Sequence, residues 1–185
     1  NDGKKTKNLN ILKLSDAKKA GTKDSAKCTL ILTEGDSALA LALAGLSVVG
    51  KDHWGAFPIK GKMLNCIRAT TSQFSSNVIV QNIMKILGLK HGKVYTDVKD
   101  LRYGKIMIMA DQDVDGSHIR GLIMALIGSK WKSLLEIPGF ITVMKTPLAK
   151  FFVRKKCVHV SFTQSDLENY QSNMDSNVRV KYYKG

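Results

Sequence analysis

Three carboxylates lie within five residues at the end of an apolar run. Asp111, Asp113 and Asp115 follow the apolar residues 106–110, and a pattern with helical spacing comes after them. Two carboxylates about 6 Å apart repel each other by roughly 3 kcal/mol at an effective dielectric constant near 20. A cluster this dense therefore favours a bound divalent cation, and its oxygen ligands suit Mg²⁺ best.

Three other interpretations fit part of this acidic pattern. A calcium loop of the EF-hand type also begins D-x-D-x-D-G, but its twelfth position needs Glu, and that position is Leu122 here. An aspartyl-phosphate nucleophile also follows a strand in a D-x-D pattern, but a third acid at Asp115 would repel the phosphate. The last alternative is a solvated acidic turn with no ligand.

Glu34 is a second candidate for the same site. It follows residues 28–32, a short apolar run that predicts a buried strand, and Gly35 then permits a tight turn. Ser37 can cap a helix over residues 38–46, which is apolar nearly all round and should be buried. Because parallel sheets place their ligands at the carboxyl ends of their strands, we expect Glu34 and the aspartates to form one site.

Strands and helices alternate along the chain, and this order predicts the α/β class. We expect a parallel sheet flanked by helices, of a Rossmann-like kind, with a small C-terminal annexe made of a β-hairpin and a helix. Gly116 and Ser117 should turn the chain and cap the helix after the acids, whereas residues 54–65 look like a glycine-spaced loop that carries Lys60 and Lys62. The further expected elements are strands at 140–144, 151–153 and 158–162, and helices at 77–87 and 167–174.

Three regions follow from this pattern. Residues 1–27 should be a basic lead-in that is partly disordered, residues 28–150 the metal-binding core, and residues 151–185 the hairpin and helix annexe. The last residues show no closing element, so we expect the chain to be a piece of something longer.

Charge and composition limit the partners and the compartment. Lys and Arg number 29 against 15 Asp and Glu, a net charge of +14, which indicates a polyanion partner whose binding weakens with salt. The three cysteines are odd in number and widely spaced, so we expect neither a disulfide nor a zinc site, and a reducing compartment. No signal-peptide core and no run of membrane-spanning length is present, so we expect neither secretion nor a membrane partner.

Several motifs together resemble the Toprim domain of type II DNA topoisomerases. They are E-G-D-S-A at 34–38, P-I-K-G-K-M-L-N at 58–65 and D-Q-D-V-D-G-S-H-I at 111–119. R-Y-G-K-I-M-I-M at 102–109 and Y-Y-K-G at 182–185 are most similar to the eukaryotic type, which large DNA viruses also carry. The resemblance covers residues 28–185 and implies a Toprim fold.

The resemblance also implies roles for individual residues. Glu34 and Asp111 would hold one Mg²⁺, Asp111 and Asp113 would hold a second, and Asp115 would be an outer-sphere or alternative ligand. Glu34 would also be the general acid and base for the departing 3′ oxygen. The expected contacts with double-stranded DNA are Lys60, Lys62, Asn65 and His118, although His118 could instead orient an aspartate.

The rest of the implied machinery lies outside this chain. In the family, a tyrosine on a winged-helix domain beyond Gly185 attacks DNA, ATP-binding domains drive the reaction, and the full enzyme is a homodimer. We therefore expect this chain to be inactive alone. The family's P-L-R-G-K loop has Ile59 and Lys60 here, and the helix after Ser37 is unusually rich in Ala and Leu, which hints at a divergent or viral source. A cellular protein would be nuclear, and a viral one would act in the host cytoplasm or at its replication site.

Two alternatives from other classes remain open. One is a Toprim nuclease or primase that completes its chemistry within a single chain. The other is a basic DNA-binding module whose acids hold a structural ion.

Overall fold

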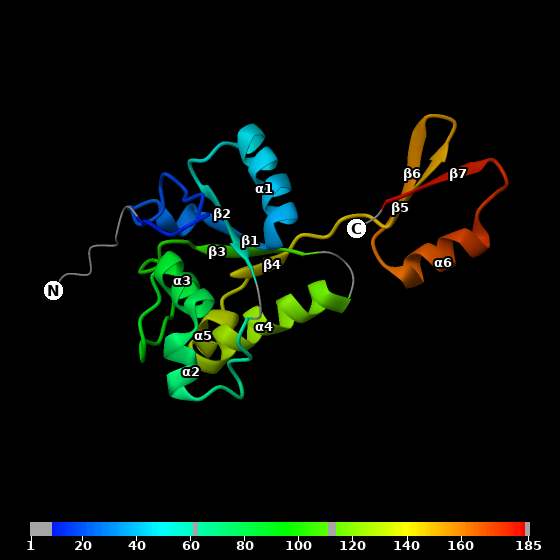
Figure 1. The fold of residues 1–185 in the computed structure, drawn as a ribbon. Helices are drawn as coiled ribbons and strands as arrows, with labels where there is room; N and C mark the ends of the chain where they lie inside the picture. The colour runs from blue at the N-terminus through cyan, green and yellow to red at the C-terminus, as the bar shows by residue number, and fades with distance from the viewer. Residues whose placement is uncertain (1–8, 61–62, 111–113, 184–185) are drawn as a thin grey trace. The chain divides into compact units, whose positions relative to one another are not determined.

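Four parallel strands in the order β2-β1-β3-β4 form the central sheet of the computed structural model (Figure 1). The structure describes residues 9–60, 63–110 and 114–183, with only the backbone described for residues 114–117. The strands are β1 (Thr29–Glu34), β2 (Trp54–Ile59), β3 (Lys105–Met109) and β4 (Ile141–Val143). The described residues divide into two compact units, residues 9–110 with 114–144 and residues 145–183.

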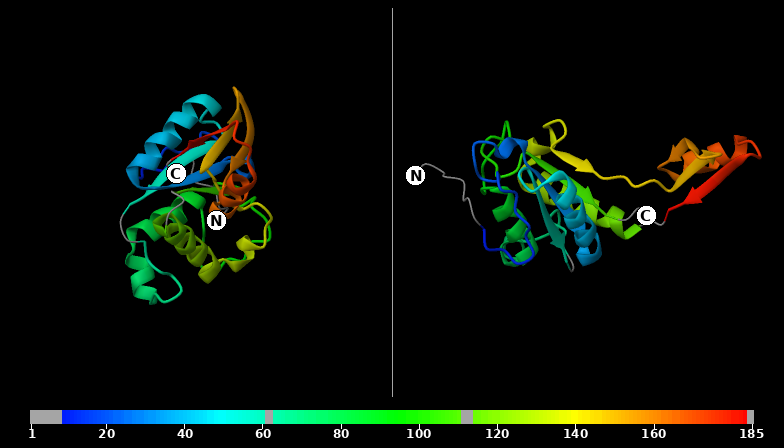
Figure 2. Two further views of the ribbon diagram at one scale, coloured as in Figure 1. Left: turned by 90° about the vertical axis from the view of Figure 1, so that its right-hand side faces the viewer. Right: turned by 90° about the horizontal axis from the view of Figure 1, so that it is seen from above.

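Helices cover both faces of this sheet (Figure 2). Side chains of β1 alternate between the faces, so Ile31 packs with Leu39 and Leu46 of α1 (Gly35–Val49). Leu30 and Leu32 belong to the larger core on the other face, which α3 (Val78–Leu87), α4 (Val114–Lys130) and α5 (Lys132–Leu135) cover. The predicted α/β class with a helix-flanked parallel sheet is therefore confirmed. No helix among the described residues is both long and apolar enough to cross a membrane.

Four local predictions in this unit were wrong. Residues 54–59 are the edge strand β2 rather than part of a loop, and Pro58 is tolerated there because an edge strand need not use every backbone N–H. The helix after the acids already begins at Val114, so Gly116 and Ser117 lie inside α4. Helix α1 begins at Gly35, so Ser37 lies inside it and does not cap it. The helix is also not buried all round, since Leu41 and Val48 are 60% and 86% exposed.

The lead-in is packed against the core from residue 9 onward. Ser15 forms an antiparallel bridge with Ala56 of β2, and Ala17 and Ala20 are buried. A 3-10 helix, η1 (Ser25–Lys27), then leads into β1. A further short helix, α2 (Thr71–Ser76), starts with a capping box between Thr70 and Gln73.

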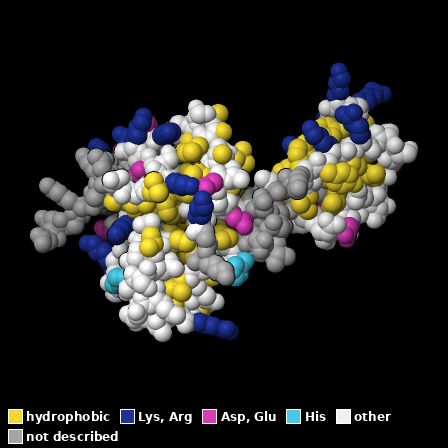
Figure 3. Space-filling model, in the orientation of Figure 1, with side chains coloured by type: hydrophobic (Ala, Val, Ile, Leu, Met, Phe, Trp, Pro, Cys, Tyr) yellow, Lys and Arg dark blue, Asp and Glu magenta, His cyan; other side chains and the backbone are white. Residues whose placement is uncertain are grey.

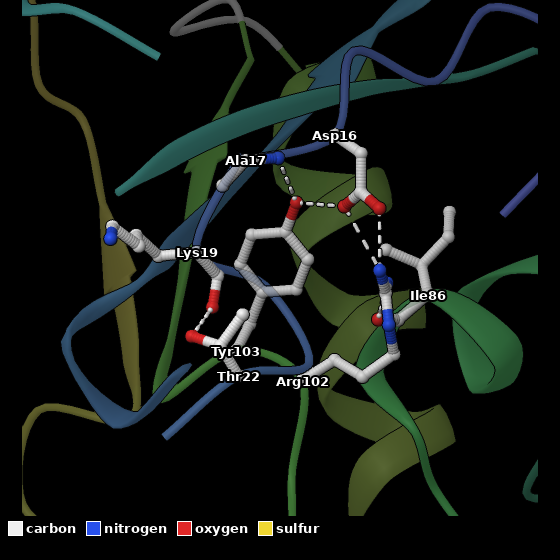
Figure 4. A network of polar contacts seen from close by, with 7 residues as sticks. All are labelled: Asp16, Ala17, Lys19, Thr22, Ile86, Arg102 and Tyr103. Carbon is white, nitrogen blue, oxygen red and sulfur yellow. Dashed lines mark hydrogen bonds and ion pairs between the residues drawn. The ribbon is translucent and has the colours of Figure 1, made fainter. Parts of the chain in front are cut away.

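A buried polar network holds the lead-in in place (Figure 4). The Arg102 side chain is 2% exposed and forms an ion pair with Asp16, while its Nη1 donates to the Ile86 carbonyl at 2.9 Å. The Tyr103 hydroxyl donates to Asp16 and accepts from the Ala17 N–H at 2.8 Å. Burial, and then the hydrogen bond to Asp16, raise the pKa of Tyr103. Breaking such a buried pair costs more than breaking a surface pair, so the network fixes the lead-in.

The second unit is a three-stranded antiparallel sheet with one helix. Its strands are β5 (Ala149–Val153), β6 (Lys156–Ser161) and β7 (Val178–Tyr182), in the order β6-β5-β7. The predicted hairpin and the predicted helix, α6 (Gln164–Asn173), are both present, and the Thr163 side chain caps α6 by accepting from the Asp166 N–H at 3.2 Å. The expectation that the chain ends without a closing element was wrong, because β7 pairs with β5.

Gly104 should tolerate no side chain. A Cβ atom built there would lie 1.9 Å from the carbonyl oxygen of Ala26, in the 3-10 helix η1 that precedes β1. We expect Gly104→Ala to lower the free energy of unfolding by about 1–3 kcal/mol, because backbone atoms must move to relieve the overlap. Urea denaturation measures this change.

Gly45→Ala is the matched control. Gly45 lies inside α1, and an added Cβ would meet nothing within 4 Å, so this change should raise the free energy of unfolding by about 0.5–1 kcal/mol. Equal effects of the two substitutions would contradict the close packing of residues 26 and 104.

Candidate metal and phosphate site

Glu34 lies at the carboxyl edge of the parallel sheet, on the strand between β2 and β3. It is the last residue of β1 and the N-cap of α1, and its side chain is half-buried with Oε2 inaccessible to solvent. The register pairs Glu34 with Ile59 of β2 and Thr33 with Met109 of β3. Continuing the pairing of Thr33 with Met109 by one residue places Glu34 level with Ala110. Asp111 directly follows Ala110 in the sequence.

Lys60 reaches the same edge as Glu34. It directly follows Ile59, the register partner of Glu34, and its Nζ lies 2.9 Å from the carboxylate of Asp36 in the first turn of α1. These two predicted site residues are thus brought together by one strand pairing.

The other predicted site residues are described only in part. Asp111, Asp113 and Lys62 lie outside the described residues, and for Asp115 the structure gives only a backbone position within α4. His118 is an exposed residue of α4. Asn65 is exposed, and its Oδ1 accepts a hydrogen bond from the Ile67 N–H at 3.2 Å, so the side chain supports a turn.

The structure adds two residues, Lys13 and Asp36, that were not predicted as site residues. Lys13 Nζ donates to both carboxylate oxygens of Asp36 at 2.8 Å, so two lysines meet on one carboxylate. The hydrogen bonds from Lys13 and then from Lys60 lower the pKa of Asp36, and Asp36 in turn raises the pKa of Lys60. Asp36 belongs to the E-G-D-S-A motif at 34–38, whereas no motif in the sequence near Lys13 indicates a role at this site.

Lys13 has an unusual backbone conformation. Its φ is 65°, in the left-handed region that non-glycine residues rarely adopt. Such conformations persist where the surrounding structure holds them and often mark functional sites. Here the backbone of the lead-in directs a cation to the edge where β1 and β2 end.

The donor set at this edge fits a hard divalent cation. Asp36 already binds two ammonium groups, whereas Glu34 places a second, half-buried carboxylate at the end of β1, where it could contribute to a metal site. The described residues contain no group of three His, Cys, Asp or Glu side chains that could hold an ion. A complete site therefore needs the aspartates that follow Ala110, which supply the oxygen ligands that Mg²⁺ prefers.

Comparisons with known proteins agree with this geometry. A family model described as "Toprim domain" matches residues 29–144, which include all four described strands of the parallel sheet. The chain is 50% identical to DNA topoisomerase 2 of Pisum sativum over 100% of its own length, and 49% identical to DNA topoisomerase 2 of Acanthamoeba polyphaga mimivirus, also over 100%. It spans only 13% and 15% of those two relatives.

A solved structure gives the same result. The crystal structure of the Plasmodium falciparum topoisomerase II DNA-binding, cleavage and re-ligation domain superimposes with a TM-score of 0.89 at 46% identity. The match covers 97% of this chain and 25% of that chain. The resemblance that the sequence motifs indicated is confirmed.

Replacing Glu34 should weaken Mg²⁺ binding. We expect Glu34→Gln to raise the Kd for Mg²⁺ about tenfold or more, because the neutral amide keeps the shape but loses the charge that attracts the ion. Isothermal titration calorimetry on the 185-residue chain measures this change.

Glu136→Gln is the control, since Glu136 is an exposed residue at the end of α5 and its loss changes the net charge equally. If both variants bind Mg²⁺ as the unchanged chain does, Glu34 is not a ligand.

Proposed function

This chain belongs to the Toprim family, and from that premise we propose that it is the magnesium-binding part of the DNA cleavage and religation core of a type II DNA topoisomerase. One observation carries the proposal: the register of β1 with β2 and β3 brings Glu34, Lys60 and Ala110, the residue before the acidic stretch, to one edge. The similarity to DNA topoisomerase 2 of plants and of mimivirus supports the reaction class.

Two Mg²⁺ ions fit the acids of this edge. Glu34 with Asp111 would hold one ion, Asp111 with Asp113 would hold the other, and Asp115 would act in the outer sphere or as an alternative ligand. Bound Mg²⁺ would stabilise negative charge on the phosphate and on the departing 3′ oxygen. Glu34 would return a proton to that oxygen, since a carboxyl group within hydrogen-bonding reach can act as a general acid.

The cations at the same edge would bind the DNA backbone. Lys13 and Lys60 are 40% and 68% exposed, so a phosphate can reach both ammonium groups. In the absence of DNA, Asp36 keeps the two lysines together and offsets their mutual repulsion. Lys62, Asn65 and His118 would extend this contact along double-stranded DNA.

The remaining parts of the reaction belong to other regions of a longer enzyme. The chain spans 13% of its Pisum sativum relative, so the nucleophilic tyrosine, the ATP-binding domains and the homodimer contacts would lie elsewhere. This chain alone would then bind Mg²⁺ and DNA without cleaving DNA or hydrolysing ATP. A cellular protein of this kind would be nuclear, and a viral one would act in the host cytoplasm or at its replication site.

Asp111 should be essential for cleavage in the full-length enzyme. Because Asp111 would contact both ions, we expect Asp111→Asn to lower the yield of Mg²⁺-dependent covalent protein–DNA adducts at least about a hundredfold. Denaturing gel electrophoresis of a labelled duplex measures the adduct.

Asp175→Asn, in the loop before β7, makes the same charge change and should leave the yield unaltered. Full cleavage by the Asp111 variant would contradict the two-ion assignment. Cleavage without any covalent adduct would favour a single-chain Toprim nuclease instead.

Lys13 should contribute to DNA binding although it lies in the lead-in. We expect Lys13→Gln to weaken binding of the chain to duplex DNA and to lower the slope of log K against log salt by about 1, as the loss of one phosphate contact does. Fluorescence anisotropy measures both quantities. Lys19→Gln, another lysine of the lead-in, is the control, and equal slopes for the two variants would remove Lys13 from the site.

A further inference from the structure

The second unit presents a basic sheet face on the side opposite to its helix. Strand β7 pairs with β5 so that Lys181 lies opposite Lys150 and Arg179 lies opposite Phe152. Side chains alternate along a strand, and Phe151 packs with Leu167 on the α6 side. Lys150, Arg179 and Lys181, here called the basic face, therefore point away from α6.

This face keeps two like charges in direct opposition. Lys150 and Lys181 are cross-strand partners, an arrangement that destabilises a sheet when nothing compensates it. Both ammonium groups lie 5.4 Å from the centre of the Tyr183 ring, which attracts cations and partly offsets their repulsion. Arg179 and Lys181 are exposed, so an anion can reach them from solvent.

The charges of this unit are segregated between its two sides. Residues 145–185 contain eight Lys and Arg residues and three Asp and Glu residues. Two of the acids, Asp166 and Glu168, lie in α6, and Asp175 lies in the loop that follows it. Figure 3 shows the Lys and Arg side chains of this unit gathered over its β-hairpin, away from the α6 end.

Three further exposed cations lie at the tip of the hairpin, close to one end of the basic face. Arg154 and Lys155 form the turn between β5 and β6, and Lys156 is the first residue of β6. None of the three pairs with an acid in any ion pair found among the described side chains. Arg154 has a left-handed backbone with φ of 56°. The cations thus run from the centre of the sheet to its tip without an intervening carboxylate.

We propose that the basic face binds the phosphate backbone of duplex DNA, as a second contact separate from the Glu34 edge. A row of phosphates supplies the several negative charges that opposed lysines need, and phosphate contacts hold a protein on DNA without reading its sequence. The choice of DNA as the polyanion rests on the proposed function. The surface itself uses none of the residues assigned to the metal site.

The salt dependence of DNA binding tests this proposal. The 185-residue chain is titrated into a fluorescent blunt duplex of about 20 base pairs in EDTA, at salt concentrations from about 50 to 200 mM. We expect the double variant Arg179→Gln/Lys181→Gln to bind the duplex roughly tenfold more weakly at the lowest salt. The magnitude of its slope of log K against log salt should fall by about 2.

Lys85→Gln/Lys132→Gln is the matched control, since it removes two exposed lysines from α3 and α5 of the first unit. This control should keep the slope of the unchanged chain. Circular dichroism checks that both double variants are folded.

Three results would overturn the proposal: equal slopes for the unchanged chain and the Arg179/Lys181 variant, equal losses in both double variants, or no duplex binding by the unchanged chain. Tighter binding to an oligothymidine than to the duplex would overturn the assignment to duplex DNA. Because EDTA removes Mg²⁺, the outcome is independent of the metal site. A slope change here together with absent Mg²⁺-dependent adducts would reject the proposed function and retain the basic face.

Discussion

The parallel register of β1 with its two neighbours is the constraint on which the rest of the site depends. It makes Glu34 the partner of Ile59 and the neighbour of Ala110, so residues far apart in sequence end at one edge. Leu30 and Leu32 face one core and Ile31 the other. A slip by one residue would exchange these faces and turn buried side chains outward. The cores on both faces therefore fix the chemistry at the edge.

The same edge combines carboxylates with cations, and Asp36 explains how they coexist. Asp36 lies in the first turn of α1, and its carboxylate accepts hydrogen bonds from the ammonium groups of Lys13 and Lys60. The proposed metal ligand Glu34 therefore lies beside a surface that can bind phosphate. The lead-in takes part in this arrangement, because the buried contact of Asp16 with Arg102 and Tyr103 anchors the segment that carries Lys13.

Sequence patterns identified the elements that are continuously apolar and missed those that are not. Strands β1 and β3 were predictable from their buried runs, whereas β2 contains Gly55 and Pro58, which normally indicate a loop. Gly55 is needed because a Cβ there would lie 2.2 Å from the Tyr103 hydroxyl, a contact that only the folded chain creates. Lys13 was missed for a similar reason, since its partner Asp36 is distant in sequence. Glu34 and Lys60 were selected as candidates because both lie within recognisable motifs.

We propose that one metal site joins the end of β1 to the acids that follow β3. Anomalous diffraction from crystals of the chain grown with Mn²⁺, which takes the same oxygen ligands as Mg²⁺, tests it most directly. We expect an anomalous peak within coordination distance of the Glu34 carboxylate and of at least one of Asp111 and Asp113. Carboxylates of Glu34 and Asp111 that point apart, with the ion bound elsewhere or nowhere, would contradict it.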